Sequence, residues 1–484
     1  MCIDLSEPLQ QISPSMMRGL TPEEVKIFNT LLNVWHRKLP GNQIKEKYYN
    51  QRNALKDLGI SIPSKLKNVD TILGWSQKAV DALAERSVFK GFTVNGEEHE
   101  GLKRIVEEND FITTYDQATT SELTNSCSFI TLSSGEEGEP DVLVNAYTAS
   151  WAAALWDYRK KRIKSGIAVI DVKEDGYGHI DPIWVNLYLD HATIVCRKAS
   201  GIWVTWRNEN PIGRPLMEPL VYLPTLQKPF GQSRITRTVR AIADSAMREA
   251  LRTEVSAEFY TAPQKYILGV DPETFGKTEE EREVKKVKAY IGTILALSQN
   301  KNGETPSVGQ FPQMSMQPHT EYLQSLAKQF AGETGIPLNS LGIVQDNPSS
   351  AEAILASTSD LIIKAEKLNR QNGRSLRNVA RMALCALNKK TLDELEERDR
   401  IDVRFENETR PSMASRADFA VKVAAAVPEY AGTATFWRDL GYDEQDIQQI
   451  TSELRRNQAQ QALVAQLGAP ADLTGAENGE GITE

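Results

Sequence analysis

The clearest hydrophobic pattern in the chain lies between Pro229 and Pro263, where apolar residues recur at helical spacing. Five of them, spaced four, three, four and four residues apart, form one stripe: Ile235, Val239, Ile242, Ala246 and Ala250. Such a stripe is typical of a long amphipathic helix. Ser233 is the expected N-cap of this helix, and Pro263 marks its end because proline cannot continue helical hydrogen bonding.

Before this segment, the hydrophobic period changes from helical to alternating. Helical spacing predicts four helices, at residues 21–39, 43–58, 69–88 and 98–123. Phe89–Val94 is expected to be a short strand between the last two. From Cys127 to Leu223, apolar and polar residues alternate between Gly-containing turns, which predicts antiparallel strands and hairpins. This half of the chain therefore indicates an α+β fold.

After the long helix, the pattern predicts a small α/β insertion at Lys265–Pro312, followed by a second helix from Pro318 to Gly332. Residues 350–388 carry the longest helical pattern in the chain, and Ile401–Phe405 is a strand candidate. Further helices are expected in residues 413–466. The remaining tail is rich in Gly, Ala and acidic residues, a composition typical of disorder.

Composition narrows the classes of function. A chain of 484 residues is expected to form two to four domains, and its net charge of −9 means that contact with DNA must be local or loose. The four cysteines are far apart in sequence, which predicts buried free thiols in a reducing compartment. The N-terminal residues lack the pattern of a signal peptide, and no apolar run reaches the roughly 18 residues of a membrane span, so we expect no membrane partner.

The sequence contains no catalytic motif with the required spacing. Gly276-Lys277-Thr278 resembles the end of a phosphate-binding loop, but the preceding Gly269 is wrongly spaced and acidic residues follow, so a surface turn is expected. The five histidines are scattered, and none has a second metal ligand at a suitable spacing. We therefore predict no catalytic, cofactor-binding or metal-binding residue.

A basic stripe is the strongest charge pattern. Five cations at spacings of three, four, three and four share one face of the predicted helix at 350–388: Lys367, Arg370, Arg374, Arg377 and Arg381. Seven apolar residues form an adjacent stripe: Leu361, Ala365, Leu368, Leu376, Val379, Ala383 and Leu387. The cations either face solvent, pair with acidic residues of a neighbouring subunit, or face DNA in a lumen.

The order of these segments resembles phage portal proteins of the SPP1-like family, in the form found in many tailed phages of actinobacteria. Five runs carry the resemblance: Phe230–Ile235, Ala257–Tyr266, Ile291–Leu297, Glu333–Pro337 with Leu341–Ile343, and Asn347–Ile354. No single run is decisive, but their order and spacing over about residues 20–450 are specific.

The resemblance implies a portal-type subunit with a wing, a helical stem, a small α/β clip and a helical crown. By this resemblance the segments are the N-terminal region and α+β wing (1–230), the first stem helix (231–262), the clip (263–315), the second stem helix (316–337), the tunnel loop (338–350), the long wing helix and return strand (351–410), the crown (411–467) and a disordered acidic tail (468–484). Pairing of the two stem helices would hold the insertion away from the body of the subunit.

The resemblance also implies partners and a place of action. The protein would form a homo-oligomeric ring of twelve at one capsid vertex of the virion, assembled in the host cytoplasm. Double-stranded DNA would pass non-specifically through its channel during packaging and ejection. The other implied partners are the major capsid protein, the scaffolding protein, the terminase large subunit and the head-to-tail adaptor, and no cofactor is implied.

Two sets of site residues follow from this assignment. The tunnel loop would narrow the channel with Gln345, Asp346, Asn347, Pro348 and Ser349, whose polar character suits sliding DNA better than tight binding. One chain offers too few partners for the stem arginines, so we expect inter-subunit or channel-facing roles for Arg237, Arg240, Arg248 and Arg252. The alternative functions are a nucleic-acid-processing enzyme with a divergent site and a peptide-binding adaptor.

Overall fold

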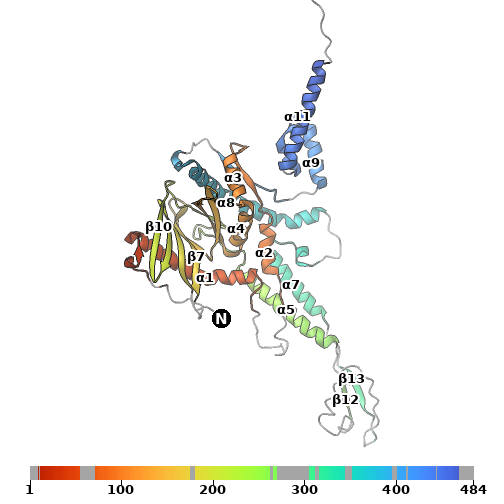
Figure 1. Ribbon diagram of the computed structural model, residues 1–484. Helices are drawn as coiled ribbons and strands as arrows, with labels where there is room; N and C mark the ends of the chain where they lie inside the picture. The colour runs from red at the N-terminus through yellow and green to blue at the C-terminus, as the bar shows by residue number, and fades with distance from the viewer. Residues whose placement is uncertain are drawn as a thin grey trace, which may run out of the picture. The chain divides into compact units, whose positions relative to one another are not determined.

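The computed structural model describes residues 9, 11–54, 71–174, 180–261, 265–269, 303, 305–310, 315–343, 351–394, 400–409, 413–442 and 444–467. It has the expected α+β class, with helices and mostly antiparallel sheets (Figure 1). The chain divides into two compact units, Met1–Glu408 and Thr409–Glu484. None of the described helices is both long enough and apolar enough to span a bilayer.

The largest sheet of the first unit has six strands. In spatial order these are β1 (Met17–Arg18), β10 (Ile202–Glu209), β9 (Ala192–Ala199), β8 (Ile180–Tyr188), β7 (Arg162–Glu174) and β6 (Ala152–Asp157). β1 pairs with β10 in parallel, and all other neighbours are antiparallel. The helix α1 (Pro22–Tyr49) covers one face, where Phe28 and Trp35 are fully buried. The Trp35 indole donates to the Ser150 carbonyl at 2.8 Å, which ties α1 to the start of β6.

Smaller sheets complete the body. The first has the strand order β11 (Met217–Val221), β4 (Cys127–Ser134) and β5 (Val142–Thr148). The second has the order β14 (Ile401–Phe405), β2 (Phe89–Val94) and β3 (Glu97–Glu98). The third pairs β12 (Lys265–Leu268) with β13 (Ser307–Gln310). The main core packs the first two of these sheets against α3 (Glu100–Glu108), α4 (Phe111–Asn125) and α8 (Ala351–Asn388). Short 3-10 turns lie at η1 (Pro14–Met16), η4 (Leu338–Leu341) and η5 (Leu392–Glu394).

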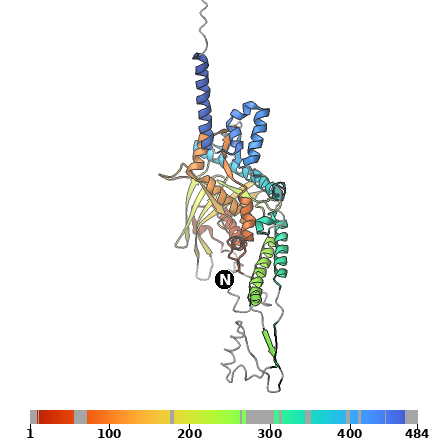
Figure 2. The ribbon, with the colours of Figure 1, turned by 90° about the vertical axis from the view of Figure 1, so that its right-hand side faces the viewer.

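Two long helices flank the insertion in sequence and pack against each other. They are α5 (Arg237–Thr261) and α7 (Gln317–Thr334), and both views show them side by side (Figure 1, Figure 2). Their shared core contains Val239 and Ala246 of α5 with Phe330 of α7, and Trp75 of α2 (Trp75–Ala84) joins it. Three residues of the predicted apolar stripe, Val239, Ile242 and Ala246, are therefore buried in the core shared with the second helix.

Several predicted helix boundaries are wrong, and three of the differences have a clear physical cause. Residues 21–39 and 43–58 were expected as separate helices, but α1 runs unbroken through Pro40 to Tyr49, because Leu39 and Asn42 on either side of the proline are buried. The helix expected at 98–123 is divided at Asp110, whose φ is 43°. The neighbouring Asn109 accepts from the Val144 amide at 2.8 Å, so a contact with β5 ends α3.

The third wrong boundary is the start of α5. Ser233 does not cap the helix, because its hydroxyl donates to the Thr124 carbonyl and accepts from the Ile235 amide. The helix begins at Arg237, and the hydroxyl of Thr236 accepts from the Val239 amide at 3.1 Å, the geometry of an N-cap. Ile235 of the predicted stripe is buried but precedes the helix.

A buried arginine joins these elements. Arg234 is only 5% exposed, and its guanidinium donates to the carbonyls of Ala79 and Thr334 and to the Tyr222 hydroxyl. Its backbone amide donates to the Leu123 carbonyl at 2.8 Å. Arg234 thus connects α2, α4, the segment after β11 and the C-terminal end of α7. A positive charge is favourable at that end because the helix dipole places partial negative charge there.

A buried carboxyl group lies beneath α8. Glu122 of α4 is fully buried, and burial raises its pKa to about 8. Asn372 of α8 donates to one of its oxygens at 2.8 Å and to the Tyr115 hydroxyl at 3.2 Å. Because the pKa lies above neutrality, Glu122 is mainly protonated in the folded protein at pH 7.

The second unit is helical. It contains α9 (Met413–Ala426), the 3-10 turn η6 (Pro428–Gly432), α10 (Ala434–Leu440) and α11 (Glu444–Leu467). Thr433 caps α10 by accepting from the Phe436 amide at 3.3 Å, and Gly441 ends it with a φ of 94°. Phe436 and Ile447 are the buried apolar side chains of its described residues.

Replacing Arg234 should destabilise the junction of the paired helices with the body. We expect Arg234→Gln to lower the free energy of unfolding by about 3 kcal/mol, because several buried acceptors lose a charged donor. Arg237→Gln is the matched control, since Arg237 is exposed and its loss should change stability by less than ~0.5 kcal/mol. Chemical denaturation followed by tryptophan fluorescence measures both, and equal stabilities would contradict the role of Arg234.

The buried Glu122 makes stability depend on pH in a defined direction. Its pKa is raised on folding, so the unfolded chain loses this proton first and stability falls as pH rises from about 4.5 to about 8. Glu122→Gln removes the titration and should therefore gain over the wild type across this window, by up to a few kcal/mol at about 1.36 kcal/mol per pKa unit. Thermal unfolding at several pH values tests this, with the exposed Glu107→Gln as control, and a pH-independent difference for Glu122→Gln would refute it.

Candidate functional site

The five predicted cations of α8 lie along its solvent side. Lys367, Arg370, Arg374 and Arg381 are exposed and Arg377 is half-buried. None of these side chains forms a hydrogen bond or ion pair with any residue that the structure describes. Six of the seven predicted apolar residues are buried and Leu387 is half-buried, on the side of the helix opposite the cations. The rotation of α8 therefore presents the whole basic stripe outward.

A second stripe, polar and at least half-buried, fixes this rotation. Asn369, Asn372, Ser375 and Asn378 follow one another at intervals of three on the packed side of α8. Asn369 accepts from the Ser87 hydroxyl at 2.6 Å and donates to the Glu408 carboxylate at 2.6 Å. Ser375 donates to the Pro219 carbonyl at 2.7 Å. Rotating α8 would break several of these bonds together, and each buried polar group left without a partner costs about 1–3 kcal/mol.

The last member of this polar stripe reaches a buried ion pair. Asn378 donates to one oxygen of Glu218 at 2.6 Å, and the Arg214 guanidinium donates to the other. Burial raises the pKa of Glu218, while the positive charges of Arg214 and Arg374 lower it. An isolated buried charge would be costly, so Arg214 and Asn378 together hold the carboxylate in place under α8.

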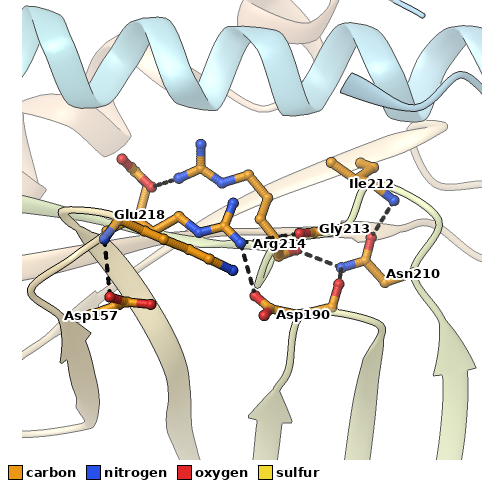
Figure 3. Close-up of polar contacts among 9 residues, drawn as sticks. Asp157, Asp190, Asn210, Ile212, Gly213, Arg214 and Glu218 are labelled. Carbon is orange, nitrogen blue, oxygen red and sulfur yellow. Dashed lines mark hydrogen bonds and ion pairs between the residues drawn. The ribbon is translucent and has the colours of Figure 1, made fainter. Parts of the chain in front are cut away.

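The loop that carries Arg214 is itself held by hydrogen bonds. Asn210 donates to the carbonyls of Arg214 and Asp190, at 2.6 and 3.2 Å, and accepts from the Ile212 amide at 3.1 Å. Figure 3 shows this loop between Asp190 and Glu218. Arg162 of β7 donates to Asp190 and to the Gly213 carbonyl, which links the loop to the six-stranded sheet. These contacts connect the orientation of α8 to the six-stranded sheet and, through Glu218 of β11, to the sheet of β11, β4 and β5.

The stem arginines differ in their surroundings. Arg237 is exposed in the first turn of α5. Arg240 lies over the ring of Tyr48, 5.7 Å from its centroid, and Arg248 donates to the Ser245 hydroxyl at 2.9 Å. Arg252 pairs with Glu249 at 3.4 Å. Of these four, Arg240, Arg248 and Arg252 have contacts within the described part of the chain, and Arg237 points to solvent.

A polar relay joins α5 to α7. Glu249 is buried and contacts Nδ1 of His319 at 2.6 Å, while Nε2 of His319 lies 3.0 Å from the Ser256 hydroxyl. This order of groups resembles a hydrolase triad, but Ser256 is 8% exposed and lies inside helix α5, where no substrate carbonyl could approach its hydroxyl. The relay therefore connects the paired helices.

The predicted tunnel-loop site residues lie outside the described part of the chain. They are Gln345, Asp346, Asn347, Pro348 and Ser349, and the strand expected at Ile291–Leu297 lies outside it as well. Among the described residues, no group of three or more His, Cys, Asp or Glu side chains is arranged to hold a metal ion. The cysteines that the structure describes, Cys127, Cys196 and Cys385, are free and buried.

Two important features escaped the sequence patterns. Arg234 was not among the predicted site residues, although it is buried just before the helix begins. The buried polar stripe of α8 was not identified either. Its signal is the interval of three between Asn369, Asn372 and Ser375, which places polar residues among the apolar ones of the same helix face.

Known proteins resemble the chain over most of its length. Residues 29–460 match the family model described as phage portal protein, SPP1 Gp6-like. The portal protein of Mycobacterium phage L5 is 28% identical over 389 residues, covering 78% of this chain and 77% of the relative. That of Mycobacterium phage D29 is 27% identical over 406 residues, covering 82% and 81%.

A solved structure is similar at a lower level. It is described as the neck of a native GTA particle computed with C12 symmetry, and it has 13% identity and a TM-score of 0.44, covering 76% of this chain and 90% of that chain. So distant a likeness says nothing further about function. The family match, by contrast, spans both compact units, and this chain belongs to the phage portal protein family of the SPP1 Gp6-like type.

Proposed function

We propose that twelve copies of this chain form a ring at one capsid vertex, and that its channel carries DNA during packaging and ejection. The observation that carries the proposal is the family match over residues 29–460. The packing of α5 against α7 supports it, because two adjacent helices on either side of an insertion form the stem that a portal subunit needs.

The parts of the chain receive roles on the same basis. Residues 1–230 and 351–410 form the wing, and the regions 231–262 and 316–337 form the stem around α5 and α7. The insertion at 263–315 is the clip, residues 338–350 are the tunnel loop, and 411–467 form the crown, followed by an acidic tail at 468–484. The buried Arg234 supports this division, because it anchors the stem to the body at one junction.

The partners follow from these roles. The clip would dock the terminase large subunit during packaging and the head-to-tail adaptor afterwards, while the major capsid protein and the scaffolding protein would contact the outer surface of the ring. The protein would be a virion component assembled in the host cytoplasm. It would contribute no catalysis, and the terminase would supply the work of ATP hydrolysis.

The net charge of −9 supports a channel that lets DNA slide. Tight neutralisation of phosphates would hold DNA in place, because each phosphate contact adds to affinity through release of counterions. Arg237 is the stem arginine that remains free to contact DNA or a neighbouring subunit. Besides simply facing solvent, the basic stripe of α8 has two candidate roles, at the channel or between subunits.

The ring is directly testable with the purified chain. We expect negative-stain images of closed rings and a mass of about 650 kDa, which corresponds to twelve copies of a 54.0 kDa chain. Mass photometry over a range of concentrations gives the population of each assembly. A chain that stays monomeric at micromolar concentration, both alone and with scaffolding protein, would contradict the proposed function.

The tunnel loop offers a second test. Asn347→Trp should place a large side chain in the narrowest part of the channel, so particles should contain severalfold less DNA while ring assembly stays normal. Asn208→Trp is the matched control, because Asn208 is exposed on β10 and tolerates a large side chain there. Packaged DNA per particle is measured by nuclease protection. Normal packaging by Asn347→Trp would remove this loop from the channel.

A further inference from the structure

We infer that the exposed side of α8 is a subunit interface, occupied by an acidic surface of the next copy of this chain. The inference rests on the proposed ring and selects between the two roles left for the basic stripe. Three observations carry it: the unpaired cations of α8, an exposed apolar residue among them, and a complementary surface elsewhere on the same chain.

The exposed side of α8 is more than a row of cations. Ile363 lies on the same face, four residues before Lys367, and is 61% exposed. A large apolar side chain gains nothing from water or from phosphate groups, but it can be buried against another protein. The stripe from Lys367 to Arg381 extends over roughly 21 Å at 1.5 Å per residue, a length suited to a protein surface.

The complementary surface lies at the edge formed by α3 and the β4–β5 turn. Six exposed acidic residues make up this acidic edge: Glu107, Glu108, Glu136, Glu137, Glu139 and Asp141. Ion pairs from Arg104 to Glu108 at 3.5 Å and to Asp141 at 2.8 Å hold the helix and the turn together. The exposed Ile112 of α4, with 43% of its surface accessible, follows shortly after α3 and is an apolar counterpart for Ile363.

Neither of these two charged surfaces is neutralised by ion pairs with the other within the described chain. Among the described residues, Glu107, Glu136 and Glu137 have no ion pair, and none of the five cations of α8 contacts the acidic edge. Two surfaces of opposite charge that do not meet within the described subunit can meet between copies. A contact between two different patches is heterologous, and such contacts close into a ring when the rotation between copies allows it.

DNA is the weaker alternative occupant. A ring would repeat the stripe in every subunit, and so many fixed cations would bind phosphates tightly and in a salt-dependent manner. That outcome opposes the sliding that a conduit requires. A contact with carboxylates of the next subunit instead neutralises the cations and aligns neighbouring copies, as complementary charges do at protein interfaces.

The test uses reversed charges and their recombination in the full-length chain. The stripe-reversed chain carries Lys367→Glu, Arg370→Glu and Arg381→Glu, and Arg374 is kept because its charge acts on the buried Glu218. The edge-reversed chain carries Glu107→Lys, Glu136→Lys and Glu137→Lys. The matched control reverses three exposed cations of the β6–β7 turn, by Arg159→Glu, Lys160→Glu and Lys161→Glu. Circular dichroism and thermal unfolding establish that each variant folds.

Each reversed chain alone should lose at least about tenfold in ring yield, because like charges then face each other at every interface. The control should assemble as the wild type does. An equal mixture of the two reversed chains should regain rings, since every interface again joins opposite charges when the two chains alternate. Native mass spectrometry should find equal numbers of each chain in these rings.

The outcomes separate the interface from the ring. Normal rings from the stripe-reversed chain, or no recovery in the mixture, would overturn the interface and leave the portal proposal intact. Open wild-type oligomers that weaken on reversal and recover in the mixture would support the interface and contradict the closed ring. A wild-type chain that does not associate would contradict both. Reversal that spares ring assembly but changes DNA packaging would assign the stripe to DNA.

Discussion

Arg234 places a positive charge where almost no water reaches it, and the arrangement of the first unit depends on how that charge is satisfied. The guanidinium donates to groups on α2, on the segment after β11 and at the end of α7. Lys364 of α8 donates to the same Thr334 carbonyl at 3.0 Å, and its pKa is lowered by burial and by the charge of Arg234. Two cations thus meet the negative end of one helix dipole, which fixes where the paired helices leave the body.

Hydrogen bonds of polar side chains in the packed face also fix the orientation of α8. An apolar face alone would allow α8 to slide or rotate slightly, because hydrophobic contact has little directional preference. The hydrogen bonds of Asn369, Asn372 and Asn378 are directional and remove that freedom. These hydrogen bonds fix the rotation of α8 about its axis. The side of the body to which the exposed cations point is therefore fixed as well, although these cations are not part of the core packing.

Sequence patterns predicted the features that depend on hydrophobic periodicity. They failed where the hydrogen bonds of a single side chain decide the structure. The apolar stripes of α5 and α8 follow from residue spacing, and so does the antiparallel sheet after Cys127. The start of α5 did not follow, because the Ser233 hydroxyl is engaged by Thr124, more than a hundred residues earlier in the chain. Such a partner can only be known once the fold brings it near.

For the basic stripe of α8, residue spacing likewise predicted one feature and left another undetermined. Spacing was sufficient to place the five cations on one exposed face of α8, because that depends only on helical geometry. Partners for the cations could not be derived in this way, because none of the five side chains forms a hydrogen bond or ion pair with a described residue. The assignment of Gln345–Ser349 to a channel constriction rests on family resemblance alone, because these residues lie outside the described part.

The separation of positive and negative charge over the surface has a physical consequence for the assembly of an acidic chain into the proposed ring. A chain with a net charge of −9 repels its copies at long range, so a ring needs local attraction strong enough to overcome that repulsion. Scattered cations would be screened beyond about 10 Å at moderate salt. Concentrating the cations on one helix, and acidic residues on one edge, would place opposite charges in direct contact between copies, as the proposed interface requires. The rigidity supplied by the buried Asn and Arg side chains is therefore what would make the surface charges effective in assembly.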